Sequence, residues 1–375
     1  MSCCAGPQNT AEGIRTAAEA RERLASDAPE DVLLALLGET HPVWSGLGGP
    51  QVVKLRVELL TALGAGSPSD AALPFLLEEL ESAHDARLTA VAAAALRRGA
   101  RRAEHVPPLL AALTYINGRD ERIELGVLGA PDPPAMTTAT EEVLRTLGWL
   151  GDVAASALPH LRVLQGAGSG PRVATAAAAA QREIEKALVG TAARPCCEPP
   201  AAIAATPAGR AAPPPLELGL EDQAGNRIRF ADYFLGRPTI VVFFYTRCEN
   251  SAKCPRTISR LGVLQQRLME RGLGEAVQTA AITYDPDYDL PDRLEQYARS
   301  YGAQTAPHHR FLRTVADHEV LREWFDLGVG YGPSLVNRHR LEAYVLDVEG
   351  RIQWTVARRR WDADDLIARA LELRG

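Results

Sequence analysis

A proline-rich stretch from Gly190 to Pro215 divides the chain into two halves with different residue patterns. It holds seven of the 26 prolines and almost no large apolar side chain, so we interpret it as a linker. A length of 375 residues also favours two domains. The sequence therefore predicts a tail at 1–28, a helical domain at 29–189, the linker at 190–215 and a second domain at 216–375.

The first half is rich in alanine and leucine at helical spacing. Three segments carry an early proline, at Pro74, Pro107 and Pro159, and proline is tolerated at a helix start because the first amide needs no partner. Alanine-rich segments follow, one of them after Asp85, a residue type that caps helices. We expect an all-α, HEAT-like solenoid whose extended surface docks a protein partner, with a plain helical bundle as the alternative.

The second half alternates strand-like and helix-like segments. Strands are predicted at 216–220, 227–230, 239–245, 277–284, 342–347 and 352–357, and helices at 256–271, 292–301, 317–325 and 362–373. The run from Thr239 to Tyr245 is apolar throughout, as expected for a strand buried on both faces. This order predicts an α/β thioredoxin-like domain with a mixed sheet.

Composition excludes several classes of protein. The formal net charge of −6, without a lysine and arginine block, argues against nucleic acid as a partner. The chain has no apolar run of the ~20 residues that span a bilayer. Met1–Thr10 lacks the charged and apolar regions of a signal peptide. Taken as given, the sequence predicts a cytoplasmic protein.

The six cysteines form three close pairs, which are too few for a disulfide scaffold in a chain this long and indicate metal or redox chemistry. The pairs are Cys3 with Cys4, Cys196 with Cys197, and Cys248 with Cys254. The first two pairs are adjacent residues in segments without a core pattern. They are accessory thiols that pass metal to the main site, thiols that form intermolecular disulfides, or thiols without a role.

Cys248 and Cys254 occupy the position where chemistry is expected. Cys248 follows a buried strand, and Cys254 precedes a helix that Pro255 can open. The partial positive charge of a helix N-terminus stabilises a thiolate, and Lys253 and Arg247 add cationic charge. We therefore expect a lowered thiol pKa at this loop.

Three segments of the second half resemble the SCO/SenC family of copper chaperones for cytochrome oxidase assembly. The segment from Cys248 to Pro255 resembles the family's cysteine pair ending in Cys-Pro between strand and helix. The segment from Tyr284 to Pro291 is similar to its Asp-Pro and Asp-Thr-Pro motif, with Leu290 in place of threonine. His339 stands where the family's copper-binding histidine precedes a strand. Five residues separate the cysteines here, whereas the family usually has three.

The resemblance implies a copper(I) site formed by Cys248, Cys254 and His339. The ligand chemistry agrees, since thiolates are soft ligands that favour copper(I) and imidazole also binds copper. Asp285 either forms a turn or cap, which we favour, or places a carboxylate beside His339. The family precedent also implies the cell envelope if the true start or an anchor is missing from the sequence.

Three functions remain open at this stage. The first is a copper-binding metallochaperone that delivers copper to an apo-metalloprotein or controls its thiol redox state, with the helical domain docking the partner. The second is an enzyme, either a thiol-disulfide oxidoreductase or a redoxin-type peroxidase. A peroxidase needs a threonine placed around its attacking cysteine, and Thr246 lies only two residues before Cys248. The third is a helical scaffold with an inert thioredoxin-like domain, which the retained cysteines and histidine disfavour.

Overall fold

The computed structural model describes residues 11–116, 120–125, 135–166, 168–191, 206–207 and 212–374. The chain forms two compact units that divide near residue 202. The vicinal cysteines Cys3, Cys4, Cys196 and Cys197 lie outside the described residues. Among the helices in the described ranges, none combines the length and the apolar character needed to cross a membrane.

The N-terminal unit is helical. Its α-helices are α1 (Ala17–Ala25), α2 (Glu30–Leu37), α3 (Gly49–Ala65), α4 (Leu73–Glu81), α5 (Ala86–Leu96), α6 (Val106–Tyr115), α7 (Ala139–Leu150), α8 (Leu158–Leu164) and α9 (Pro171–Thr191). Short 3-10 helices lie at Ala11–Gly13, Pro42–Trp44, Ala103–His105 and Gly151–Ala157, and β1 (Ile123–Leu125) pairs with β2 (Ala135–Thr137). Helix α1 falls inside the segment 1–28 that we interpreted as a tail, and it buries Ala20.

The local signals of the helical half act as expected. Pro74, Pro107 and Pro159 each lie in the first turn of a helix, α4, α6 and α8 respectively. The Asp85 carboxylate caps α5 by accepting from the backbone amides of Arg87 and Leu88, at 2.9 and 3.1 Å. The sequence therefore placed these helix starts correctly from their proline and aspartate residues.

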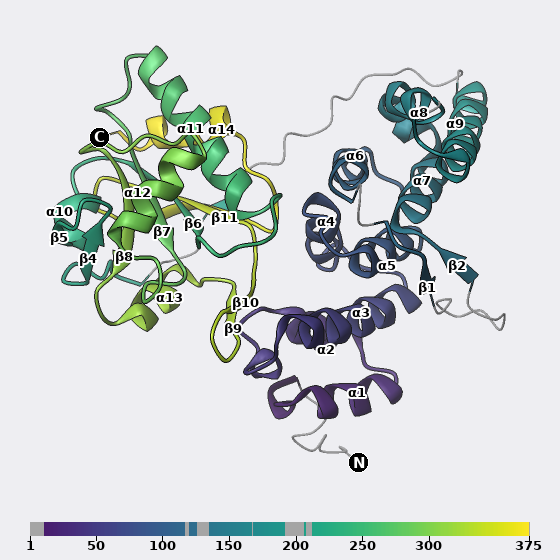
Figure 1. Cartoon of the computed structure of the whole chain (residues 1–375), viewed down its shortest axis with the longest axis horizontal. Helices are drawn as coiled ribbons and strands as arrows, with labels where there is room; N and C mark the ends of the chain where they lie inside the picture. The colour runs from purple at the N-terminus through teal and green to yellow at the C-terminus, as the bar shows by residue number, and fades with distance from the viewer. Residues whose placement is uncertain are drawn as a thin grey trace. The chain divides into compact units, whose positions relative to one another are not determined.

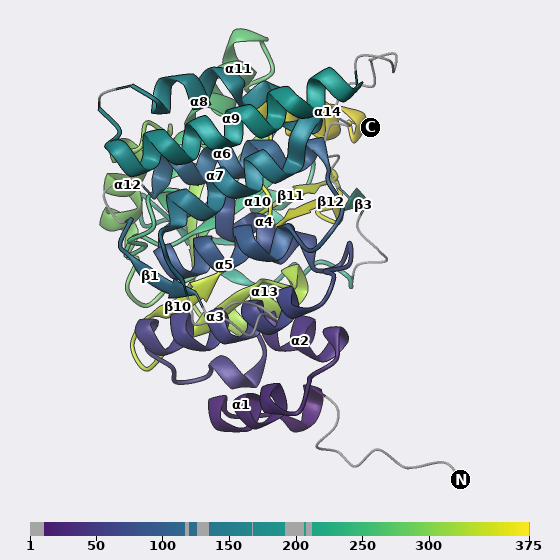
Figure 2. The same cartoon turned by 90° about the vertical axis from the view of Figure 1, so that its right-hand side faces the viewer.

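Small residues bring neighbouring helices of this unit close together. Helix α5 contacts α3, α4 and α7, and α7 in turn contacts α9, which runs beside it in Figures 1 and 2. A methyl group on Gly148 of α7 would lie 3.1 Å from the Cα of Ala180 in α9, so the two backbones nearly touch. A buried ion pair adds to this packing, since Arg56 Nε of α3 lies 2.5 Å from Glu79 Oε1 of α4.

The C-terminal unit is built on a mixed eight-stranded sheet of order β3-β12-β11-β6-β7-β8-β4-β5 among the described residues. The strands are β3 (Thr206–Pro207), β4 (Gly219–Asp222), β5 (Arg227–Arg229), β6 (Thr239–Phe244), β7 (Gln278–Thr283), β8 (His309–Thr314), β11 (Glu342–Leu346) and β12 (Ile352–Ala357). A separate ribbon pairs β9 (Val329–Tyr331) with β10 (Val336–His339). The helices are α10 (Phe230–Phe234), α11 (Cys254–Glu270), α12 (Pro291–Ser300), α13 (His318–Phe325) and α14 (Ala363–Glu372).

The central strands explain why the apolar runs are continuous. Strand β6 runs parallel to β7 and antiparallel to β11, so it has a neighbour on each side, and all six of its residues are buried. Helices α11 and α14 contact each other and both contact β6, while α12 contacts β8 (Figure 1). The predicted thioredoxin-like domain with a mixed sheet is confirmed. The central strand β6 ends at Phe244 and α11 begins at Cys254. We call the connection between them, residues 245–253, the cysteine loop.

Candidate metal centre

The cysteine loop folds back on itself between β6 and α11. The amide of Lys253 donates to the carbonyl of Asn250 at 2.9 Å, and the side chain of Asn250 accepts from the amide of Ala252 at 3.0 Å. These turns place Cys248, which is partly exposed, near Cys254, the first residue of α11, which is buried. The five residues that separate the cysteines thus turn tightly enough for both sulfurs to lie close to one point.

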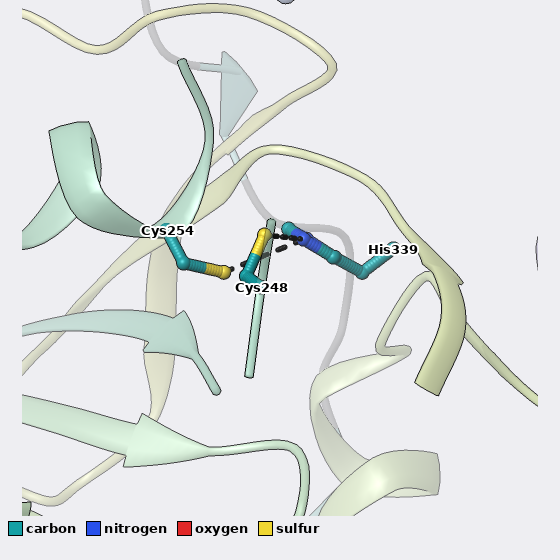
Figure 3. Close-up of side chains that lie close together, drawn as sticks. All are labelled: Cys248, Cys254 and His339. Carbon is teal, nitrogen blue, oxygen red and sulfur yellow. Dashed lines mark hydrogen bonds between the residues drawn. The ribbon is translucent and has the colours of Figure 1, made fainter. Parts of the chain in front are cut away.

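His339 comes to the same point from the end of β10. Its Nε2 lies 3.5 Å from Sγ of Cys248 and 3.4 Å from Sγ of Cys254 (Figure 3). On the other side of the ring, Nδ1 lies 3.1 Å from the backbone carbonyl oxygen of Arg340. A carbonyl only accepts, so this contact assigns a proton to Nδ1 and makes Nε2 the ring nitrogen that faces the sulfurs and is free to bind a metal.

Aromatic side chains enclose the imidazole. The ring of Tyr245 meets that of His339 edge-on at 5.5 Å between centroids, and the ring of Tyr284 lies at 5.3 Å. Tyr284 is fixed in turn, because its hydroxyl donates to Glu342 Oε1 at 2.5 Å. These tyrosines restrict the rotation of His339, and the sequence analysis did not identify them as part of the site.

The donor set has the spacing that a shared metal ion requires. Three ligand atoms, one each from Cys248, Cys254 and His339, lie within 4.8 Å of one another. When thiolate and imidazole bind one ion at bond lengths of about 2.0–2.3 Å, the sulfur and nitrogen lie roughly 3.6 Å apart. The observed sulfur–nitrogen distances of 3.5 and 3.4 Å are close to that value. The structure thus brings these three predicted ligands together.

The Cys248 thiol loses its proton readily, whereas the Cys254 thiol retains its own. A hydrogen bond from the Cys254 thiol, together with the contact with His339, lowers the pKa of Cys248 well below its usual value. Burial raises the pKa of Cys254 well above its usual value, and the neighbouring Cys248 thiolate adds to this shift. We expected the helix N-terminus to favour a thiolate at Cys254, but full burial outweighs it there. A metal ion that binds both sulfurs must therefore displace the proton of Cys254.

Asp285 contacts Arg247 and the turn that follows β7. Its carboxylate pairs with Arg247 at 2.5 Å, and its carbonyl accepts from the amides of Tyr288 and Asp289, at 3.1 and 2.9 Å. Asp285 is thus a turn residue, the role we favoured. The orienting contact of His339 comes from the Arg340 carbonyl instead.

A buried carboxylate that the sequence analysis overlooked anchors the start of the cysteine loop. Asp289 is fully buried and accepts from the Thr246 amide at 3.1 Å, and it also accepts from the hydroxyls of Thr246 and Thr283. Thr246 is the residue considered for a peroxidase, and its hydroxyl is bound to Asp289. The signal that could have found Asp289 is its place two residues before Pro291, in the motif after β7.

His309 is a buried histidine at the start of a strand. It is the first residue of β8 and is fully buried, and its Nδ1 lies 2.9 Å from the hydroxyl oxygen of Thr279. Strand β8 buries four of its six residues, and the adjacent polar residues His308, His309 and Arg310 concealed the start of this strand in the sequence.

Comparisons with known proteins agree with the motifs of the C-terminal unit. No curated protein matches the chain in sequence. A SCO1/SenC family lipoprotein from Bacillus anthracis is similar in structure, with 21% identity over 42% of this chain and 96% of its own, at a TM-score of 0.37. ScoI of Bradyrhizobium japonicum, solved with copper bound, shows 19% identity over 45% of this chain and 99% of its own, at 0.35.

A third similar structure is BsSco, described as having a disulfide switch and as a member of the Sco family of cytochrome c oxidase assembly proteins. It shows 20% identity over 43% of this chain and 96% of its own, at a TM-score of 0.36. The sequence profile of the SCO1/SenC family matches residues 217–309, which include both cysteines and the Asp-Pro motif. The resemblance to the SCO/SenC family that these motifs predicted is thereby confirmed over residues 217–309.

Proposed function

We propose that the C-terminal unit binds copper(I) through Cys248, Cys254 and His339 and acts as a copper chaperone. The observation that carries this proposal is the convergence of both sulfurs on Nε2 of His339, at 3.5 and 3.4 Å. Two thiolates and one imidazole are a soft donor set that favours copper(I). A structural zinc site would have a fourth ligand, and the group of described residues that can hold a metal here contains three.

The unequal exposure of the two cysteines supports transfer of the bound copper. Cys248 is partly exposed, while Cys254 and His339 are 1% and 5% exposed. An incoming ligand from another protein therefore reaches the copper beside Cys248 first and replaces that sulfur before the other two ligands. The copper is the cargo in this proposal, and the recipient is an apo-metalloprotein. Cytochrome oxidase is the recipient class that the family resemblance implies.

The helical unit supplies the docking surface in the same proposal. We interpret 29–189 as HEAT-like repeats and 190–215 as the linker, so that the repeats hold a protein partner while the C-terminal unit at 216–375 handles copper. The contacts of α4 with α5 and α6, and of α5 and α6 with α7, support this interpretation.

Thiol-disulfide exchange is a second candidate function, which the lowered pKa of Cys248 favours. Its thiolate would attack a partner disulfide and form a mixed disulfide, releasing one partner thiolate. Cys254 would then attack Cys248 and release the second thiolate, so that the partner gains the two electrons that the pair loses. This chemistry needs both cysteines and does not need His339 as a ligand.

Copper(I) titration separates the two candidates. Anaerobically reduced full-length protein is titrated against a chromogenic copper(I) chelator and compared with Cys248→Ser, Cys254→Ser and His339→Ala. We expect one tightly bound equivalent that each cysteine variant loses and His339→Ala weakens. His308→Ala removes an imidazole elsewhere and should bind as the wild type does.

Weak copper binding that is indifferent to His339 would refute the copper proposal. Disulfide reduction would then be measured for the wild type and the variants. His339→Ala should retain this activity, and Cys248→Ser should lose it. The cysteine variants alone cannot discriminate, because both functions need the sulfurs.

A further inference from the structure

A buried lysine connects the two segments that carry the ligands. Lys253 directly precedes Cys254, and its Nζ lies 2.6 Å from the backbone carbonyl oxygen of His339. The lysine side chain is buried, with 6% of the residue exposed. The two bonded residues lie 86 positions apart in the chain. The sequence analysis counted Lys253 only as a nearby cation.

This contact is a strong and specific one. A hydrogen bond from an ammonium group to a carbonyl is charge-assisted and shorter than a neutral one. Withdrawing a lysine from water is costly, so the buried ammonium depends on the groups that accept its hydrogens. The bond therefore holds the backbone at His339 against the backbone at Cys254, the next residue after Lys253.

The imidazole is consequently held at two independent points. The Lys253 ammonium fixes the main chain of His339, and the Arg340 carbonyl fixes the ring through Nδ1. The distance of 3.4 Å between Cys254 Sγ and His339 Nε2 spans the same two segments as the lysine bond. Loosening the lysine bond should thus lengthen that distance before it disturbs the cysteine pair.

The lysine charge also suits a copper(I) complex. One copper(I) ion with two thiolates and a neutral imidazole carries one net negative charge. A buried net charge is unfavourable unless an opposite charge lies near it. The ammonium of Lys253, tied to the backbone of a ligand residue, supplies an opposite charge at the site.

We propose that Lys253 is a positioning residue for the metal centre. Lys253 binds the His339 carbonyl, sets the separation of His339 and Cys254, and balances the charge of the bound copper. The proposal rests on the proposed copper function. It also gives the five-residue loop between the cysteines a role, since the last loop residue delivers the ammonium to β10.

The test uses full-length protein with Lys253→Met, which keeps the side-chain length and removes the charge and the donor. Lys253→Arg keeps the charge and a donor. Arg267→Met is the matched control, because it removes a cation from α11, the helix that follows Lys253, where Arg267 pairs with Asp364 at the surface. Thermal unfolding of each metal-free variant establishes that it is folded.

Copper(I) affinity is the first readout. We expect Lys253→Met to bind 10–100-fold more weakly, as is typical when a residue that supports a ligand is lost. Lys253→Arg should recover most of the affinity, and Arg267→Met should stay within about twofold of the wild type. X-ray absorption of the copper-loaded Lys253→Met protein should show a lengthened or lost nitrogen ligand with both sulfurs retained. Wild-type affinity together with an unchanged nitrogen ligand in this variant would overturn the proposal.

The metal-free protein gives the second readout, which does not depend on copper. Histidine labelled with ¹⁵N reports the ring environment by NMR, and His339→Ala identifies the His339 signal. We expect Lys253→Met to shift or broaden that signal, and Lys253→Arg to restore it. An unchanged signal refutes the positioning role. If the wild type binds no copper but the signal moves, the positioning role stands and the copper function fails.

Discussion

Replacing Asp289 with alanine should loosen the cysteine loop at its origin. The buried carboxylate accepts from the Thr246 amide and from the hydroxyls of Thr246 and Thr283. Each buried donor left without an acceptor costs about 1–3 kcal/mol. The hydroxyls can rotate toward other acceptors, whereas the backbone amide cannot. Burial raises the pKa of the Asp289 carboxyl, so removal of the carboxylate also returns part of its desolvation cost.

The expected net loss is about 2–4 kcal/mol in the free energy of unfolding, since the unsatisfied donors outweigh the desolvation that is recovered. At a urea dependence of about 2 kcal/mol per molar, the midpoint should fall by roughly 1–2 M. Alkylation of Cys254, read by peptide mass spectrometry across a urea series, reports on the C-terminal unit alone because this buried thiol lies in α11.

Two comparisons sharpen this experiment. Asp287→Ala removes an exposed carboxylate from the same loop and should leave the midpoint nearly unchanged. Thr246→Val should cost less in the Asp289→Ala background than in the wild type, with a coupling of about 1 kcal/mol or more. Equal midpoints for Asp289→Ala and Asp287→Ala, or strictly additive effects of the Thr246 and Asp289 substitutions, would show that Asp289 does not anchor the loop.

Two further predictions follow from buried positions in the same unit. Gly262→Ala should destabilise the protein by about 1–3 kcal/mol although alanine favours helix, because the added methyl would lie 2.4 Å from the Gly302 carbonyl oxygen. Gly49→Ala should not destabilise the protein, because Gly49 has open space around it. Differential scanning calorimetry of both variants measures the two effects. Burial lowers the pKa of His309 to about 4, so the folded protein resists its protonation. As the pH drops from about 6.5 to 4, the free energy of unfolding should therefore fall by about 3 kcal/mol more in the wild type than in His309→Asn. Urea titrations at the two pH values measure this difference, and an equal fall in both proteins would contradict the prediction.

Most of the fold was accessible from local patterns. The strand from Thr239 to Tyr245 was predictable because a strand buried on both faces is apolar throughout, and the structure places β6 there. Helix α11 was predictable from its amphipathic spacing, although it begins at Cys254, two residues before the predicted start. Strand β10 was missed because its residues Val336–His339 are mostly polar and its only partner is another short strand.

The site was accessible in part, for a physical reason. Cys248 and Cys254 could be nominated because their thiols stand between a buried strand and a helix, and His339 could be nominated from the resemblance to the SCO/SenC family. The supporting contacts could not be nominated, since they depend on where the backbone of distant segments lies. The bond from Lys253 to the His339 carbonyl is one such contact, and the pairing of Asp285 with Arg247 is another.

The distance along the chain between the sulfurs and the imidazole has a consequence for biosynthesis. His339 follows Cys254 by 85 positions, so at about 5–20 residues per second the ribosome adds it roughly 4–17 s later. Strand β11, which pairs with β6, is made later still. The newly made thiols thus exist for seconds without the third ligand and without the strand that completes the centre of the sheet. Acquisition of metal by the full ligand set is therefore an event that follows translation of the segment that reaches His339.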